Sequence, residues 1–129
     1  MISASHNPFS DNGIKLFGSD GEKLPESTLA LVEEYLDGGT LPLATGADIG
    51  RTVDYVAGRN RYLACLLSLP RASFRGLRVG LDCANGSAWA LAKTVFDALG
   101  AQVRCIGVSP DGTNINADCG STRPERLCE

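Results

Sequence analysis

Residues 77–108 constrain the fold more than any other part of the sequence, because three short patterned segments follow one another there. LRVGLDC at 77–83 is a short apolar run rich in strand-forming residues. Residues 87–99 then repeat leucine and valine at helical spacing, and Gly100 ends this pattern. AQVRCIGV at 101–108 is a second strand-forming run. A strand, a helix and a strand within about thirty residues predict a βαβ unit, with two parallel strands and a right-handed crossover.

The first half of the chain predicts a hairpin followed by two helices. In residues 13–24, apolar and polar side chains alternate ahead of a GSDG turn sequence, as expected for a β-hairpin. From Pro25, apolar residues recur at helical spacing until two consecutive glycines at 38–39 end the pattern. Residues 39–50 show no periodicity and predict a linker, and a second helix is expected at about 54–67.

Length, charge and cysteine content exclude several classes of protein. A chain of 129 residues can form one ordinary domain or parts of two. Its 12 basic and 15 acidic residues give a net charge of −3, so there is no electrostatic reason to expect nucleic acid or an anionic membrane as partner. No apolar run approaches the roughly 18 residues that span a bilayer, and the N-terminus lacks a secretory pattern. The five cysteines are widely spaced without a CxxC, and a single histidine cannot complete a zinc site with them. We therefore expect a cytoplasmic protein with reduced thiols.

Polar side chains crowd into the first fifteen residues, MISASHNPFSDNGIK. Serine, asparagine and proline form ordinary surface turns, which is the simplest interpretation of this loop. Neighbouring side chains of an extended backbone point to opposite faces, so the spacing argues against a direct catalytic pair of Ser5 and His6. The DNG turn at 11–13 precedes a strand that carries Lys15. A hydroxyl, an imidazole and an ammonium brought together by two turns could handle a phosphate, and the residues alone leave Ser3 open as a rival acceptor.

Two later loops carry further polar residues. LDCANGSAW at 81–89 joins a strand to a helix, as phosphate-binding turns do, but it fits neither common glycine pattern of nucleotide-binding folds. We therefore interpret it as an ordinary turn with Ser87 near the helix N-cap. PDGTNINADCGSTRPE at 110–125 fails the calcium-loop pattern and by itself predicts only a turn-rich loop.

Taken in order, these stretches resemble one family, the α-D-phosphohexomutases. ISASHNPFSDNGIK at 2–15 closely resembles the active-site serine loop of that family. VGLDCANGSAW at 79–89 resembles the first strand and turn of its second domain, and residues 110–125 resemble a stretch that marks the bacterial phosphoglucosamine mutases within it. The resemblance implies an α/β fold of partial phosphohexomutase architecture. Residues 1–45 would form the end of domain 1, a hairpin plus a helix, and residues 46–129 the first βαβ unit of domain 2.

The same resemblance assigns roles to individual residues. Ser5 would carry the phosphoryl group, and His6 and Lys15 match family positions assigned to active-site electrostatics and proton transfer. The phosphoserine would donate its group to a hexosamine phosphate, the bisphosphate would reorient, and the serine would take back the other phosphate. Glucosamine 6-phosphate and glucosamine 1-phosphate would thereby interconvert. The implied cofactor is Mg²⁺, held through the phosphate on Ser5 and by aspartates of a DGDGD-type loop that does not occur in this sequence. Arg123 stands where family members commonly have histidine.

The resemblance also implies that the chain is part of a longer protein. Family members have four domains and several times this length, so we expect the chain to be a piece that is inactive alone, with Met1 an interior residue of the parent. Uncovered strand edges and helix faces would then make it marginally stable or self-associating. The alternatives are a phosphoglucomutase or phosphomannomutase of the same family, and a non-catalytic binding module that keeps the serine loop as a turn. Oligomeric state is left open.

Overall fold

The computed structural model describes residues 1–40 and 42–129, which divide into two compact units. The first unit comprises Met1–Ile2 and Ile14–Asp54, and the second comprises Ser3–Gly13 and Tyr55–Glu129. The second unit therefore combines residues 3–13 of the serine loop with the whole C-terminal half of the chain. The domain boundary expected at 45/46 stays a prediction.

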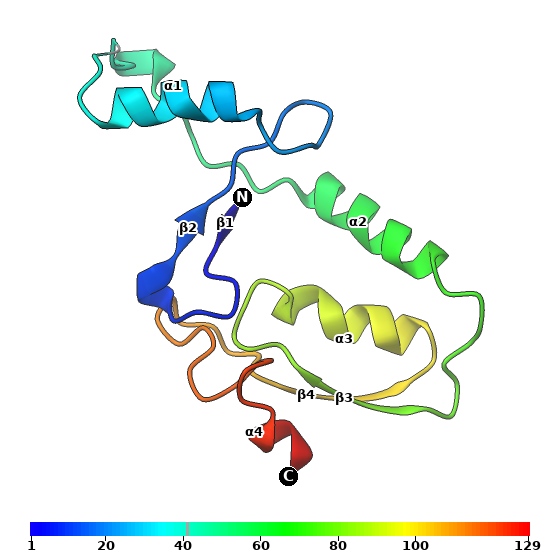
Figure 1. Cartoon of the computed structure of the whole chain (residues 1–129). Helices are drawn as coiled ribbons and strands as arrows, with labels where there is room; N and C mark the ends of the chain where they lie inside the picture. The colour runs from blue at the N-terminus through cyan, green and yellow to red at the C-terminus, as the bar shows by residue number, and fades with distance from the viewer. Residues whose placement is uncertain (41) are drawn as a thin grey trace. The chain divides into compact units, whose positions relative to one another are not determined.

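The predicted βαβ unit is confirmed (Figure 1). Strand β3 (Arg78–Asp82) and strand β4 (Gln102–Ile106) pair in parallel, and helix α3 (Trp89–Ala98) connects them. The register runs from Arg78 opposite Gln102 to Asp82 opposite Ile106. Because both strands run in the same direction, the loops that follow them emerge at one edge of the sheet.

The strands alternate between half-buried and exposed residues, as expected for a sheet with one covered face. Val79 and Leu81 of β3 are half-buried, as are their partners on β4, whereas Arg78 and Gly80 are exposed. Helix α3 packs against both strands. Its predicted apolar positions Leu91, Val95 and Leu99 are half-buried, so periodicity identified the face of this helix correctly.

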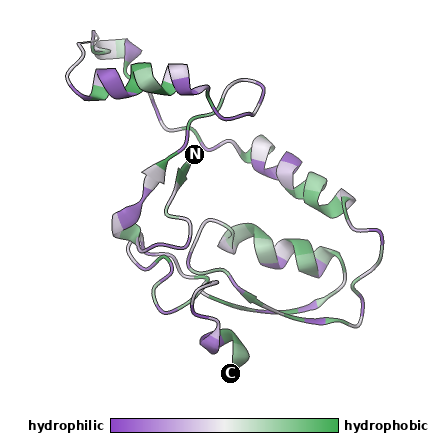
Figure 2. Ribbon diagram, viewed as in Figure 1, coloured by the Kyte–Doolittle hydropathy of each residue, from purple (hydrophilic) through white to green (hydrophobic). Residues whose placement is uncertain are grey.

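The remaining helices of the second unit are α2 (Val56–Ser68) and α4 (Glu125–Cys128). Helix α2 packs against α3 and confirms the helix expected at about 54–67. Figure 2 shows apolar and polar residues interspersed along α2 and α4, and apolar residues prominent on α3. The rings of Phe74 and Phe96 lie 5.9 Å apart between centroids, which adds an aromatic contact beside this packing.

The first unit contains helix α1 (Glu26–Leu36), which begins after Pro25 as the sequence predicts. The predicted hairpin is much reduced: Phe17 and Lys23 form one isolated antiparallel bridge around the GSDG turn. Strand β2 (Gly13–Ile14) instead pairs with strand β1 (Ile2–Ser3). The linker expected at 39–50 contains a short 3₁₀ helix, Gly46–Asp48, and its residue Leu41 lies outside the described residues.

Few side chains are fully buried. Among the described apolar residues, only Ala4, Cys83, Ala101 and Cys119 are buried. All four are small, and all four belong to the second unit. The core of the βαβ unit is therefore built largely from half-buried side chains. The expectation of marginal stability or self-association stays a prediction.

Within residues 1–40 and 42–129, no helix combines the length and the apolar character that crossing a lipid bilayer requires.

Gly107 directly follows β4, at a point where a side chain would overlap with the loop after β3. Its φ is +62°, and a Cβ there would lie 2.7 Å from both the Ala84 nitrogen and the Asp82 Oδ1. We predict that Gly107→Ala lowers the free energy of unfolding by about 3 kcal/mol, because strain and overlap with backbone combine. The control Gly112→Ala also has positive φ but meets nothing within 4 Å, and should cost about 1 kcal/mol. Urea unfolding followed by circular dichroism measures both, and equal losses would contradict the steric explanation.

Candidate functional site

The serine loop presents an exposed hydroxyl in a strained turn. Ser5 has a φ of +55°, in the left-handed region that residues other than glycine seldom adopt. In this conformation the Ser5 Oγ and the His6 Nδ1 lie 3.5 Å apart. The expectation that these side chains point to opposite faces is therefore wrong, because it assumed extended backbone. The contact is long for a hydrogen bond, and either the Ser5 hydroxyl or a protonated Nδ1 can be the donor.

Two local hydrogen bonds stabilise this turn. The Ser3 Oγ accepts a hydrogen bond from the Ser5 N–H at 3.1 Å. The Asn7 N–H donates to the Ala4 carbonyl at 3.0 Å, and Ala4 itself is buried, with 5% of its surface exposed. A short 3₁₀ helix, Phe9–Asp11, follows. Ser3, the rival acceptor, thus supports the backbone of Ser5.

A residue more than a hundred positions away also holds the serine loop. The Asn116 carboxamide donates to the Ser5 carbonyl at 3.0 Å and to the Asn7 carbonyl at 2.7 Å. Asn116 lies in the loop after β4, and its own N–H donates to the Ala84 carbonyl, in the loop after β3, at 2.9 Å. The serine loop is therefore tied to the edge of the sheet where both strands end.

The Asp82 carboxylate fastens the two loops at that edge. Its Oδ1 accepts the Ala84 N–H at 2.8 Å, and its Oδ2 accepts the Gly120 N–H at 2.6 Å. Asn85 adds a second tie, since its Oδ1 accepts the Ser109 N–H at 3.0 Å and its amide donates to the Asn114 carbonyl at 3.3 Å. These side-chain bonds add to backbone hydrogen bonds between the two loops, such as the one from the Asn85 N–H to the Gly107 carbonyl at 2.7 Å.

Strained backbone gathers in the same place. Five residues other than glycine have positive φ among those described: Ser5, Ala84, Asn85, Asn116 and Asp118. All belong to the serine loop or to the loops after β3 and β4. Such conformations cost of order 1 kcal/mol or more each and persist where surrounding contacts enforce them, which is typical of functional sites.

Asp111 organises the start of the loop after β4. Its Oδ1 accepts the Thr113 N–H at 2.8 Å, the Thr113 hydroxyl at 3.0 Å and the Asn114 N–H at 2.9 Å. These donors, led by the Thr113 N–H, lower the pKa of the Asp111 carboxyl from its usual value.

The buried cysteines are structural. Burial raises the pKa of the Cys83 thiol, and neighbouring Cys105 raises it further. Burial also raises the pKa of the Cys119 thiol, which has no exposed surface and accepts a weak contact from the Asn85 amide at 4.0 Å. Both thiols are therefore protonated at neutral pH and serve as small apolar groups.

Three other predicted residues have less connection to this cluster. Lys15 belongs to the first unit, so its place beside Ser5 stays a prediction. Ser87 is exposed and does not cap α3, because Ala88 occupies the N-cap without a side-chain bond. Arg123 is exposed, and its backbone N–H donates to the Gly120 carbonyl at 3.0 Å.

A metal site requires more ligands than the described residues bring together. In residues 1–40 and 42–129, there is no group of three or more histidine, cysteine, aspartate or glutamate side chains placed to hold an ion. A phosphate on Ser5 would supply only oxygen donors of its own. The described donor set therefore does not form a magnesium site by itself.

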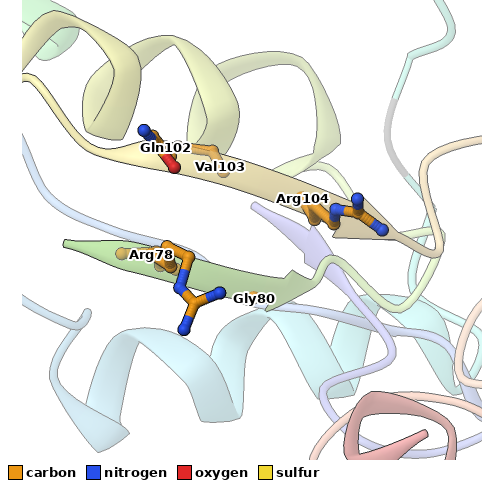
Figure 3. Close-up of a pocket in the computed structure, with 6 residues that line it drawn as sticks. Arg78, Gly80, Gln102, Val103 and Arg104 are labelled. Atoms are coloured by element: carbon orange, nitrogen blue, oxygen red, sulfur yellow. The ribbon is translucent and has the colours of Figure 1, made fainter. Parts of the chain in front are cut away.

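A hollow lies on the exposed sheet face, where Figure 3 shows Arg78, Gln102 and Arg104 along the two strands. It is lined by the first three residues of β3 and of β4. The loops that contact Ser5 follow the last residues of these strands. This basic hollow therefore lies at the opposite end of the strands from the loops that contact Ser5.

Sequence reasoning missed the role of Asn116, Asp82 and Asn85. Asp82 ends β3, Asn85 lies in the loop after β3 and Asn116 in the loop after β4, and carboxyl ends of parallel strands share an edge. That topological signal, together with the frequency of asparagine and aspartate at left-handed positions, would have placed these residues in one cluster.

Comparisons with known proteins indicate the family to which the chain belongs. Residues 1–42 match the family described as phosphoglucomutase/phosphomannomutase, alpha/beta/alpha domain I. The matched range includes the whole serine loop. Together with the relatives described next, this match confirms the resemblance: the chain belongs to the phosphohexomutase family.

Its relatives extend the match to the rest of the chain. The chain is 64% identical over 129 residues to a phosphoglucosamine mutase of Lachnospira eligens and 57% identical to one of Lachnoclostridium phytofermentans, with 98% of the chain covered in each case. It is 52% identical over 131 residues to a phosphoglucosamine mutase of Brevibacillus brevis, with the whole chain covered. In all three cases the chain spans 29% of the length of the relative.

Because the Asp82 carboxylate accepts a hydrogen bond from each of two loops, we expect its replacement by asparagine to destabilise the protein. Asp82→Asn keeps the shape but turns one acceptor into a donor that opposes a backbone N–H. We expect a loss of about 1–3 kcal/mol in the free energy of unfolding, because one N–H is left without its partner. Asp97→Asn is the matched control, since Asp97 is exposed and pairs only with Lys93 on α3. It should cost about 0.5 kcal/mol or less. Urea unfolding distinguishes the two, and a negligible effect at Asp82 would show that its bonds are dispensable.

The pKa of the Asp111 carboxyl should lie below that of an aspartate in an unfolded chain. Because its folded pKa is depressed, its contribution to stability is present above that value and is lost as the pH falls through the folded pKa. Carboxyl chemical shifts followed by NMR measure this directly. Thr113→Val removes one donor and should raise the Asp111 pKa part of the way. An unshifted pKa in the unmodified chain would contradict the bonding described above.

Proposed function

We propose that this chain supplies the phosphoryl-carrying serine loop of a phosphohexomutase that interconverts glucosamine 6-phosphate and glucosamine 1-phosphate. The observation that carries the proposal is the exposed Ser5 hydroxyl, held in a strained turn 3.5 Å from the His6 imidazole. This turn lies within the range that matches domain I of the family. The sugar assignment rests on the relatives, since all three described above are named phosphoglucosamine mutase.

The proposed reaction consists of two balanced transfers. In the first, a hydroxyl oxygen of the sugar phosphate attacks the phosphorus of phosphoserine 5, the bond between Oγ and phosphorus breaks, and the hydroxyl proton passes through a base to the leaving Oγ. The sugar bisphosphate then reorients. In the second, the Ser5 Oγ gives up its proton and attacks the other phosphorus, the bond between that phosphorus and its sugar oxygen breaks, and the sugar oxygen takes up the proton. Nothing is consumed overall, and a sugar bisphosphate can load the serine initially.

His6 and Lys15 have complementary roles in this proposal. The imidazole is close enough to Oγ to exchange a proton with it as the transfer proceeds. A phosphoserine carries a charge of about −1.5 to −2 at neutral pH, which a nearby ammonium would offset. Lys15 is our candidate for that ammonium, on the strength of its family position.

Magnesium belongs to the proposal as the family's cofactor. When bound, it would neutralise charge on the transferring phosphoryl group, with a phosphate oxygen on Ser5 as one of its ligands. Further ligands would come from outside the described residues. A sugar phosphate is the proposed substrate, and glucose or mannose phosphates are the alternative because the matching family description names those mutases.

The central prediction concerns covalent phosphate. When the protein is expressed from its complete gene and purified, its intact mass should include a phosphoryl group that peptide mapping places on Ser5. Ser5→Ala should remove this group and abolish mutase activity, because no other hydroxyl replaces the acceptor. Ser10→Ala, on the same loop, is the control and should keep both.

Three outcomes would contradict parts of the proposal. Phosphate on Ser3 would show that the acceptor is misassigned. An unphosphorylated protein without turnover, which nonetheless binds sugar phosphates, would favour the non-catalytic binding module. Faster turnover of glucose or mannose phosphates than of glucosamine phosphates would reassign the substrate.

A further inference from the structure

We propose that Asn116 is a positioning residue for the serine loop: its carboxamide fixes the backbone on both sides of His6 and so sets where Ser5 and His6 point. The inference rests on the proposed function, since it assigns to that same site a residue that acts through others. Asn116 touches neither the Ser5 hydroxyl nor the imidazole in the recorded hydrogen bonds. It acts only on main-chain carbonyls.

The geometry of the contact is specific. A primary carboxamide has two N–H donors, and the Asn116 nitrogen lies within hydrogen-bond distance of two acceptors, the Ser5 carbonyl at 3.0 Å and the Asn7 carbonyl at 2.7 Å. These carbonyls flank His6 in the sequence. Fixing both holds the Ser5–His6 and Asn7–Pro8 peptide planes, which enclose the segment that carries the imidazole, and so restricts the directions of the Ser5 and His6 side chains.

The serine loop needs such an external contact. Ser5 is held at a φ of +55°, which costs about 1 kcal/mol or more for a residue with a side chain. The bonds inside the loop engage the Ser5 N–H and the Ala4 carbonyl. The Ser5 and Asn7 carbonyls are engaged by Asn116, a residue 111 and 109 positions away.

Asn116 is itself anchored to the sheet. Its N–H donates to the Ala84 carbonyl at 2.9 Å, and its φ of +58° is one that asparagine tolerates better than most residues. Gly120 leaves room for the carboxamide, because a Cβ there would lie 3.2 Å from the Asn116 Oδ1. Gly120 is in turn bound by Asp82 at the end of β3. Through these bonds, the position of Ser5 depends on the parallel pair of strands β3 and β4.

The test compares two asparagines of one loop in the protein expressed from its complete gene. Asn116→Asp has the same size but replaces the donor group by a carboxylate oxygen, which cannot bind the two carbonyls and repels them. Asn114→Asp is the matched control, since the Asn114 side chain bonds only Ser109 and Asp111 of its own loop. Asn116→Gln keeps the donor group on a longer side chain.

We expect Asn116→Asp to slow the loading of Ser5 by a sugar bisphosphate, followed by mass spectrometry, about 10–100-fold. A misplacement of about 1 Å at a reacting group has an effect of this size. The kcat should fall in parallel while the KM for the sugar phosphate stays near that of the unmodified protein, because the substrate contacts are untouched. Asn116→Gln should recover part of the loss. Asn114→Asp should remain close to the unmodified protein in loading rate, kcat and KM.

Hydrogen exchange provides a readout that is independent of activity. The backbone amides of Ser5, His6, Asn7 and Phe9 should exchange faster in Asn116→Asp than in Asn114→Asp, since only the first variant releases the serine loop. Equal exchange in the two variants, or unchanged loading of Ser5 in Asn116→Asp, would overturn the positioning role. If Ser5 of the unmodified protein is never phosphorylated, the proposed function fails, and the exchange rates still decide whether Asn116 holds the loop.

Discussion

Parallel pairing of β3 with β4 is the constraint on which the second unit depends. Parallel strands need a crossover, which α3 provides, and they deliver both following loops to one edge. There the Asp82 carboxylate binds one backbone N–H from each loop. Through Asn116 the same edge holds the serine loop. An antiparallel arrangement of the same strands would carry these loops to opposite ends and leave the serine loop without this support.

The site achieves order with polar side chains and strained backbone rather than with a large core. Small residues are the only fully buried ones among those described, and the five left-handed residues other than glycine all lie in the three loops of the site. Four of these five residues, Ser5, Ala84, Asn85 and Asn116, form hydrogen bonds that connect them to the ends of the strands. Stability and site geometry are therefore coupled here, because the hydrogen bonds that offset strain also orient the serine.

Much of the fold could be predicted from local patterns. Periodicity located α1, α2 and α3 and both strands of the βαβ unit to within a few residues, because each buries one face and therefore alternates at a characteristic spacing. The hairpin at 13–24 was predicted too large, since β2 pairs with β1 and leaves a single bridge around the turn. The direction of His6 relative to Ser5 was predicted wrongly, because nothing local reveals that a serine takes a left-handed conformation.

By itself, the sequence determined the element types, the parallel unit and the family, because hydrophobic spacing and a long serine motif are carried by neighbouring residues. Only the tertiary structure decided which loop holds the serine. Asn116 and Ser5 lie 111 positions apart, and they meet because strand pairing and the Asp82 carboxylate fold the intervening chain back to one edge. A contact of that kind depends on the direction and register of two strands, which no local pattern of residues encodes.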